Sequence, residues 1–242
     1  MNPVLILTRN NLALTKRCVE SVQQQDVPVG IFVVDNGSTD GTREWLQSED
    51  FPGIVKINEN NDGVSAGWNH GLSYIFGERT KGRHHFQSDH ALVIGNDTVL
   101  PQWFYRELLA YEVPFVTGLA QENMDEIAEP KAPVPLDPHP DFSAFLIRRQ
   151  AWETVGPFDE RMKLYASDCD WHVRAHRKGI SLWKANTSYY HERSSTLRLA
   201  SEEDRQKILV QANEDRVMFR SLYGCIPGES VYDNLFQAST EP

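Results

Sequence analysis

The chain has 242 residues, 40% of them apolar and 24% charged, and its 24 Lys and Arg against 34 Asp and Glu leave a net charge of −10. This composition is ordinary for a globular protein of one large domain or two small ones, and the acidic balance disfavours nucleic acid as the main partner. No apolar run approaches the ~18 residues that a membrane helix requires, and the start, MNPVLILTRNN, lacks a basic leader, so we expect a cytoplasmic protein.

The first hundred residues alternate between short apolar runs and amphipathic segments. Leu14, Cys18 and Val22 lie four residues apart, which is the spacing of one helix face. The pattern predicts four strands, at 3–8, 29–35, 53–61 and 90–97, and three helices, at 12–25, 40–48 and 64–78. Alternating strands and helices are typical of an α/β fold with a twisted, mostly parallel sheet flanked by helices.

Polar side chains follow each of the four predicted strands. They are Thr8, Asp35, Asn60 and Asp97. Because parallel strands end at the same edge of a sheet, and ligands of such sheets bind beyond that edge, we expect these residues to lie close together around a ligand. A turn explains any one such cluster, since Asp, Asn, Gly and Ser are turn residues. Four clusters on one edge favour a binding site.

The second half of the chain is less regular. Residues 126–141 are rich in Pro and acidic residues and predict an irregular loop, which we interpret as a lid or acceptor wall. A helix is predicted from Asp168 to a closing Gly179, and a last helix from Ser201, whose spacing from Asp204 is that of a capping box. The apolar face of the last helix is predicted to consist of Ile208, Leu209, Ala212, Phe219 and Leu222.

Five segments resemble family 2 glycosyltransferases in their order along the chain. They are VVDNGSTDGT, NENNDGVSAGWNHGL, VIGNDT, GPFDERMKLYASDCDW and YYHERSS, and the resemblance covers about residues 3–196. It implies a single GT-A domain over 1–200, with a nucleotide-sugar-binding half (1–100), an acceptor and catalytic half (101–200) and a helical extension (201–242). The family usually transfers a sugar from a nucleotide-activated donor with inversion of the anomeric centre.

The resemblance implies a nucleotide pocket at the ends of the first two strands. Thr8 and Asn10 match positions that line this pocket, and Asp35 matches an acid that contacts the N3–H of uracil or thymine, which implies a UDP- or dTDP-type donor. A carboxylate suits that role because it accepts hydrogen bonds and the imide N–H donates one. The alternative for Asp35 is a turn in which its carboxylate accepts from Ser38.

The segment SAGWNHG resembles the stretch that borders the nucleotide in the family. Asn69 is the predicted contact, and Gly63 would let the backbone approach the ligand closely. The alternative is a loosely packed helix start, and Trp68 is predicted to be a core residue.

The resemblance also implies a divalent cation, Mn²⁺ or Mg²⁺, on the diphosphate. Asp97 matches the carboxylate that binds the metal, and His191 matches a histidine that completes the metal shell. Gly95 stands where the family has a first Asp, so Asn96 is predicted to contact the ribose or phosphate instead.

The segment SDCDW matches the position of the catalytic base, which the resemblance assigns to Asp168. Ser167 replaces the Glu that precedes the base in the family. Asp170 does not form a catalytic pair with Asp168, because helix residues two apart point to different sides. The structural alternative for Asp168 is an N-cap.

Two other functions stay open at this stage. Gly95 and Ser167 keep open a nucleotide-sugar-binding scaffold without catalysis, and a nucleotidyltransferase is the third possibility, although it would typically have a Gly-rich loop where this chain has TRNNLAL. The acceptor classes are a glycan, a lipid-linked glycan, a protein or a modified nucleobase.

Overall fold

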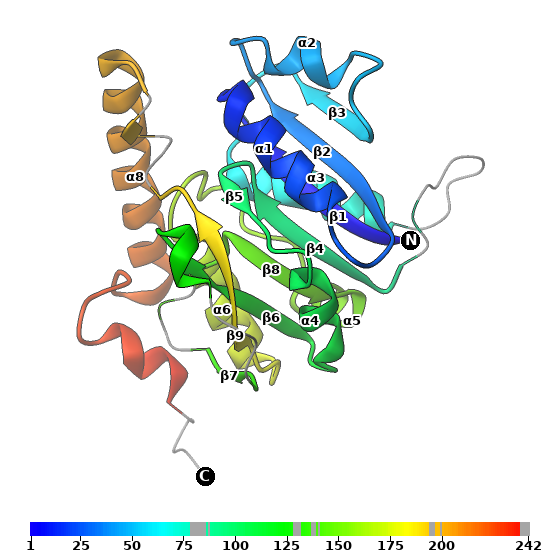
Figure 1. Ribbon diagram of the computed structural model, residues 1–242. Helices are drawn as coiled ribbons and strands as arrows, with labels where there is room; N and C mark the ends of the chain where they lie inside the picture. The colour runs from blue at the N-terminus through cyan, green and yellow to red at the C-terminus, as the bar shows by residue number, and fades with distance from the viewer. Residues whose placement is uncertain are drawn as a thin grey trace.

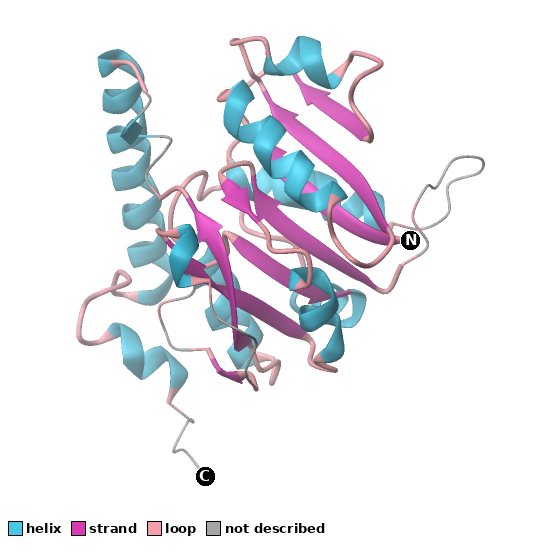
Figure 2. Cartoon of the chain, in the orientation of Figure 1, coloured by secondary structure: helices cyan, strands magenta, loops and turns pink. Residues whose placement is uncertain are grey.

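The computed structural model describes residues 1–77, 86, 88–127, 132–136, 139, 141–193, 197–198 and 200–237. In this part of the chain a nine-stranded sheet runs through the molecule in the order β3-β2-β1-β4-β8-β6-β9-β5, with β7 also paired to β9. Figure 2 shows the sheet as a twisted layer with helices on both sides.

The first half of the chain forms a parallel sheet with its crossover helices. The elements are β1 (Asn2–Thr8), α1 (Leu12–Gln23), β2 (Val29–Asn36), α2 (Thr42–Leu46), β3 (Ile54–Asn58), α3 (Val64–Phe76) and β4 (His90–Gly95). All three pairings among β3, β2, β1 and β4 are parallel. β1, β2 and β4 are mostly buried on both faces, which is why they read as continuous apolar runs, whereas the edge strand β3 is only partly buried. The predicted α/β class and the predicted elements of this half are confirmed.

The second half adds strands of mixed direction. The elements are β5 (Thr98–Val99), α4 (Phe104–Ala110), β6 (Phe115–Gln121), β7 (Val134–Pro135), β8 (Ala144–Arg148), α5 (Arg149–Val155), α6 (Ser167–Arg177) and β9 (Trp183–His191). β8 is antiparallel to β4 and β6, whereas β9 is parallel to β6 and antiparallel to β5. The uninterrupted run of parallel pairings therefore ends at β4, and β6 with β9 forms a separate parallel pair in the mixed part of the sheet.

The helices cover the two faces of the sheet with separate apolar layers. Residues of α1 and α4 pack on one face, and residues of α3, α5 and α6 pack on the other. Figure 1 shows the corresponding arrangement, with α1 and α3 on opposite sides of β1 and β2. The second layer is rich in aromatic rings, among them Phe115, Phe145 and Trp171.

The predicted ends of α6 and of the last helix are confirmed in their capping contacts. Gly179 has a φ of 72° and donates to the His176 carbonyl at 3.0 Å, while the next N–H donates to the Ala175 carbonyl at 2.9 Å, a Schellman arrangement. The last helix, α8 (Glu202–Tyr223), starts after Ser201, whose hydroxyl accepts from the Asp204 N–H at 3.1 Å.

The helix α8 lies along one flank of the molecule (Figure 1). Phe219 is buried in an apolar cluster with Tyr232, from the 3₁₀ turn η2 (Tyr232–Phe236), and with side chains of α6. Ile208 and Ala212 are also buried, but Leu209 and Leu222 are 51% and 40% exposed. The prediction that these two leucines lie on the packed face was wrong, because the buried residues of α8 form a narrower stripe than the apolar residues do.

The acidic, Pro-rich segment 126–141 is partly regular. It begins at the end of the 3₁₀ turn η1 (Met124–Glu126) and contains β7, which pairs with β9 at the sheet edge. The prediction of an irregular loop was therefore wrong for 134–135. Residues 128–131, 137–138 and 140 of the predicted lid lie outside the described part of the chain.

Among the described residues, no helix combines the length and the apolar character needed to span a bilayer.

Candidate active site

A cleft lies at the carboxyl ends of β1 and β4 and consists of two adjoining cavities. The first, which we call the strand-end cavity, has a volume of about 300 Å³ and is lined by residues that include Thr8, Asn10, Asn96 and Asp97. The second, the Asp168 cavity, has a volume of about 470 Å³. The two share Asp97 and several apolar side chains, so they form one continuous space.

The Asp168 cavity brings together three of the predicted site residues. Asp97 follows β4, Asp168 lies in the first turn of α6, and His191 ends β9, and all three line this cavity. They are far apart in the sequence, and the mixed sheet places them side by side. Asp35, Gly63 and Asn69 line neither cavity of the cleft.

The strand-end cavity has a floor of cross-linked polar groups. Asn96 donates through its side-chain amide to the Asn10 carbonyl at 3.1 Å and to the Thr15 hydroxyl at 2.9 Å, and the Thr15 hydroxyl lies 2.9 Å from that of Thr8. Asn10 has a φ of 59°, and its side-chain oxygen accepts from the Thr39 N–H at 2.7 Å. Asparagine tolerates this left-handed conformation better than most residues. The loop after β1 is therefore held rigidly above the sheet.

Asp35 is fully buried and its carboxylate is occupied by the chain itself. It accepts from the Ser38 N–H at 3.1 Å, from the Ser38 hydroxyl and from the Arg43 guanidinium at 3.4 Å. This is the turn that we considered as the alternative. The predicted contact of Asp35 with a base stays a prediction, and in this structure the turn uses the same oxygens.

The neighbouring Asn36 lines the cavity instead, and we did not predict it. Its amide donates to the Asn61 side chain and to the Gly63 carbonyl, both at 3.0 Å, and Asn61 also lines the cavity. Both residues lie in the segments that resemble the family, but the sequence offers no signal that separates Asn36 from Asp35. Which of the two side chains points into the cavity depends on the turn that Ser38 closes.

In this structure Gly63 and Asn69 make contacts within the fold, and their predicted contact with the nucleotide stays a prediction. Gly63 has a φ of 92°, and a Cβ at this position would lie 2.8 Å from the Lys163 backbone, so the close approach is made by the chain. Asn69 donates to the Phe158 carbonyl at 2.9 Å and accepts from its N–H at 2.8 Å. Asn69 thus clamps α3 to the segment before α6.

Asp97 and His191 face each other across the cleft. The Asp97 Oδ2 lies 3.4 Å from the His191 Nε2, and the two side chains are 17% and 16% exposed. The β5–β9 pairing, which sets Thr98 opposite His191, brings them together. Among the described residues the His191 Nδ1 is buried without a hydrogen-bond partner. Gly95 was predicted to leave the pair without a second carboxylate. A side chain at this position would also crowd the pair, because a Cβ there would lie 2.8 Å from the Asp97 Oδ1.

This pair fits one divalent cation. Two ligands that each lie about 2.0–2.2 Å from a metal are roughly 3 Å apart, close to the observed separation. Within the described ranges no group of three or more His, Cys, Asp or Glu side chains is placed to hold a metal. A cation at Asp97 and His191 would therefore complete its shell with water and substrate oxygens, as hard cations often do.

Asp168 has the raised pKa that a general base needs. Burial raises the pKa of its carboxyl to about 6, and the charge on Asp141 adds to the rise, while the Cys169 N–H, which donates to Asp168 at 2.8 Å, lowers it. The N-cap of α6 is Ala166, which has a φ of 63°, so the N-cap alternative for Asp168 was wrong.

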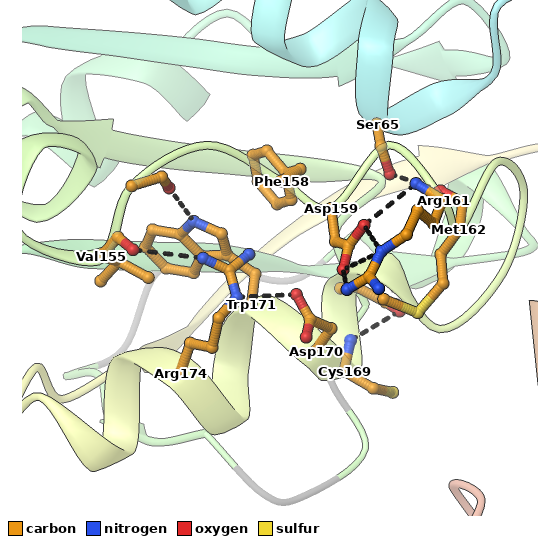
Figure 3. Close-up of polar contacts among 12 residues, drawn as sticks. Ser65, Val155, Phe158, Asp159, Arg161, Met162, Cys169, Asp170, Trp171 and Arg174 are labelled. Carbon is orange, nitrogen blue, oxygen red and sulfur yellow. Dashed lines mark hydrogen bonds and ion pairs between the residues drawn. The ribbon is translucent and has the colours of Figure 1, made fainter. Parts of the chain in front are cut away.

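Asp170 points into the scaffold, as the helix geometry predicted. Figure 3 shows its carboxylate with Arg174, whose Nε donates at 2.8 Å, and the Tyr223 hydroxyl donates to its other oxygen at 2.6 Å. The same view shows Trp171, which donates from its indole N–H to the Gly156 carbonyl at 3.0 Å. These contacts hold α6 in place, and they leave Asp168 without a paired carboxylate from its own helix.

A buried carboxylate of α8 holds the loop before α6. Asp215 is fully buried and accepts from the backbone N–H groups of Lys163, Leu164 and Tyr165 at 2.8–3.0 Å. Leu164 lines both cavities of the cleft. We did not predict this residue, because an acidic side chain in a charged helix normally faces solvent.

A second polar group beside Asp168 was also missed. Asp141 and Ser143 line the Asp168 cavity, Asp141 pairs with Arg193 at 3.2 Å, and the Ser143 hydroxyl lies 2.5 Å from that of Tyr189. The segment that contains Asp141 looked like a Pro-rich loop. Its place beside the cleft follows from the antiparallel strand β8, which the sequence pattern did not predict.

Comparison with known proteins agrees with this architecture. Residues 4–113 match the family model described as glycosyl transferase family 2. No curated protein sequence matches the chain.

Three solved structures illustrate the similarity in fold. A mannosyltransferase, PcManGT from Pyrobaculum calidifontis, in complex with GDP-Man and Mn²⁺, is 16% identical, with a TM-score of 0.61 over 81% of this chain and 59% of its own. GalNAc-T7 with UDP, GalNAc and Mn²⁺ is 13% identical, with a TM-score of 0.62 over 79% and 43%. S. aureus TarS 1–349 in complex with UDP-GlcNAc is 15% identical, with a TM-score of 0.55 over 98% and 70%.

The first two of these structures are considerably longer, and this chain spans 59% and 43% of them. At these identities the likeness shows the fold, and the family model adds sequence evidence for residues 4–113. Part of the chain, residues 4–113, is therefore similar to glycosyl transferase family 2, and the described chain has the GT-A-like fold of these structures.

Proposed function

We propose that this chain transfers a sugar from a nucleoside diphosphate sugar to an acceptor hydroxyl with inversion at the anomeric carbon, and that Asp168 is the general base. The observation that supports it most is the shared cavity of Asp97, Asp168 and His191. Three titratable groups from separate segments meet in a cleft at the strand ends, which is where ligands of such sheets bind.

Asp168 would accept the proton of the acceptor hydroxyl as the oxygen attacks the anomeric carbon. A carboxyl with a pKa of about 6 is ionised at neutral pH and is a stronger base than an ordinary aspartate. An attack from the side opposite the leaving diphosphate inverts the configuration.

Asp97 and His191 would hold a divalent cation, Mn²⁺ or Mg²⁺, which supplies charge neutralisation for the departing nucleoside diphosphate. Thr8, Asn10 and Asn96 would surround the nucleoside in the strand-end cavity. The proposed donor is of the UDP or dTDP type. The relatives that were solved with GDP-Man, UDP and UDP-GlcNAc make guanine and uracil nucleotides the first to compare by thermal shift.

The substitution Asp168→Asn tests the proposal. It keeps the shape and the acceptor for the Cys169 N–H but removes the base, so we expect transfer to fall by about 10²–10⁴-fold while nucleotide affinity changes by less than about twofold. Sugar transfer is measured as released nucleoside diphosphate, and product stereochemistry by NMR. Asp50→Asn, at an exposed position, is the control. Transfer at the normal rate in Asp168→Asn, or a product with retained configuration, would contradict the proposal.

A nucleotide-sugar-binding scaffold without catalysis is the second candidate. It is favoured by Gly95, which removes one carboxylate from the metal motif, and by Ser167 in place of the family's Glu. Tight binding of a donor with no hydrolysis or transfer, across glycan, lipid-linked, protein and nucleobase acceptors, would support the scaffold over the enzyme.

A further inference from the structure

A third cavity opens beside the strand-end cavity, between the end of β1, the loop before α6 and the helix α8. It has a volume of about 250 Å³, and we call it the Arg9 cavity. Arg9 and Asn61 line both this cavity and the strand-end cavity, and Lys163 and Lys207 line the Arg9 cavity alone. Asp204 lines it as well, so the cavity is a side chamber of the cleft with three cationic side chains and one carboxylate.

Two of these cations lack an acidic partner, the partly buried Arg9 and the exposed Lys163. Within the described residues neither the Arg9 guanidinium nor the Lys163 ammonium forms an ion pair or a hydrogen bond, and the Arg9 Nε is buried without a partner. Lys207, in contrast, pairs with Glu203 at 2.7 Å and approaches Asp204 at 3.8 Å. A buried donor without a partner is costly, and such groups call for an explanation such as a bound ion. The buried, unsatisfied Arg9 Nε is the observation that points to an anion, and Lys163 adds a second positive charge on the same small cavity.

The backbone presents Lys163 in a fixed position. Its N–H donates to the buried Asp215 at 3.0 Å, its carbonyl accepts from the Val64 N–H at 2.5 Å, and Gly63 leaves room for its backbone. These three contacts give Asp215, Val64 and Gly63 a role in positioning Lys163, whereas the proposed mechanism of transfer assigns them none.

Arg9 is held in a similar way. It lies between the end of β1 and Asn10, whose N–H donates to the Ser38 hydroxyl at 2.7 Å and whose side chain accepts from the Thr39 N–H at 2.7 Å. Rigid placement before binding reduces the entropy lost when a ligand is bound.

We propose that Arg9 and Lys163 bind a phosphate group of a substrate. Arginine offers a planar fork of N–H donors that matches phosphate oxygens, and lysine adds a compact charge. The phosphate belongs either to the diphosphate of the donor or to a phosphate-bearing acceptor. This assignment to a substrate rests on the proposed function, whereas phosphate binding at Arg9 does not require that transfer occur.

The test uses inorganic pyrophosphate and UDP as probes, in EDTA, with isothermal titration calorimetry and thermal shift on the full chain. We expect Arg9→Gln and Lys163→Gln each to weaken pyrophosphate binding by about tenfold, and Arg9→Lys to retain part of it. Lys56→Gln, which removes an equal charge at an exposed site of β3, should change the affinity by less than about twofold. Arg9→Lys also keeps the proposal testable if Arg9→Gln folds poorly.

Competition identifies the source of the phosphate. If saturating UDP abolishes pyrophosphate binding, the site takes the donor diphosphate; if pyrophosphate still binds, and Arg9→Gln removes that binding, the site takes an acceptor phosphate. Equal pyrophosphate affinity in Arg9→Gln, Lys163→Gln and Lys56→Gln would overturn the proposal. Because these measurements involve no transfer, that result is independent of the Asp168→Asn experiment.

Discussion

The carboxyl of Asp168 illustrates how much the chemistry of one side chain depends on its neighbours. Burial is the largest influence on its pKa and raises it, the charge of Asp141 raises it further, and the Cys169 N–H opposes both. An aspartate with an ordinary pKa near 4 would be a weaker base, and without the hydrogen bond from the Cys169 N–H the pKa of Asp168 would be raised further.

The pH dependence of transfer follows from these influences. A base must be deprotonated to act, so we expect kcat/KM to rise with pH through about 6 and to level off above it. Asp141→Asn removes a like charge, which lowers the pKa of Asp168, so the rising limb should move to lower pH. Initial rates from pH 4.5 to 8 measure this, with Asp50→Asn as the control. If the rise of kcat/KM occurs at the same pH in Asp141→Asn, the charge of Asp141 does not affect the pKa of Asp168.

Gly95 shows a second dependence of this kind. A Cβ at this position would lie 2.8 Å from the Asp97 Oδ1, a separation at which one of the two groups must move. We expect Gly95→Ala to displace the Asp97 carboxylate and to reduce the gain in nucleotide affinity on adding Mn²⁺ by about tenfold, the lower end of the effect of misplacing a metal ligand.

The control for Gly95→Ala is internal. In EDTA the variant and the parent should bind UDP equally well, because the substitution acts on Asp97 and leaves Arg9 and Lys163 in place. Calorimetry with and without Mn²⁺ provides both comparisons. A full metal effect in Gly95→Ala would show that Asp97 is not a metal ligand.

Among the helices, α8 supports the loop beside the cleft through a buried carboxylate, Asp215. Asp215 collects three backbone N–H groups of the loop that leads to α6, and its other contact is the Gln211 side chain at 3.0 Å. The loop in turn accepts a hydrogen bond at the Met162 carbonyl from the Ser65 hydroxyl of α3, at 2.6 Å, which Figure 3 shows. Asp215 of α8 and Ser65 of α3 therefore hold the loop that leads into α6, and with it the position of Asp168.

Asp215→Asn tests this support. One carboxamide oxygen cannot accept as many hydrogen bonds as a carboxylate, and its NH₂ would face backbone donors, so we expect the free energy of unfolding to fall by about 1.5–3 kcal/mol. Because the loop loosens, kcat should fall more than KM changes. Urea denaturation and steady-state kinetics measure the two effects.

Glu214→Gln is the matched control, since the neighbouring Glu214 is exposed on the same helix and its substitution should change the free energy of unfolding by less than about 0.5 kcal/mol. Equal stability of the two variants would mean that Asp215 does not hold the loop.

The cleft is lined by segments that lie far apart in the chain, the loop after β1 and the helix α8. Arg9 and Asn10 belong to the first loop, and Asp204 and Ile208 belong to α8, yet all four line the strand-end cavity. We predicted residues 201–242 as an extension beyond the domain. The burial of Phe219 and Tyr232 against α6 argues instead that this extension is part of the same folded unit.

Truncation after residue 200 tests the relation of the extension to the domain. It would remove Asp215 and uncover the apolar residues Met162, Ala166, Cys169 and Val173. We expect the shortened chain to bind the dye ANS, to lose more than about 3 kcal/mol of stability and to bind UDP at least tenfold more weakly. A shortened chain with unchanged stability and affinity would support the predicted domain boundary at residue 200.

The sequence pattern was most informative where the structure depends on neighbours along the chain. The apolar runs and helical spacings of residues 1–97 predicted the parallel half of the sheet, and Gly179 and Ser201 marked helix ends through contacts within a few residues of themselves. The direction of parallel strands then placed Thr8 and Asp97 at one edge. Such features are local, because hydrogen bonding and periodicity act over a single strand or helix.

The tertiary structure decided which polar side chains face the cleft. Asp35 and Asn69 have the same residue types as Asp97 and Asn96, which line the cleft. The Asp35 carboxylate instead accepts hydrogen bonds from Ser38 and Arg43, and the Asn69 amide bonds to the Phe158 backbone. Asp215 holds a loop fifty residues earlier in the chain, and the antiparallel strand β8 brings Asp141 beside Asp168. The reason is physical: the partner of a buried polar group is set by packing between distant segments, and nothing in the residues around it specifies that partner.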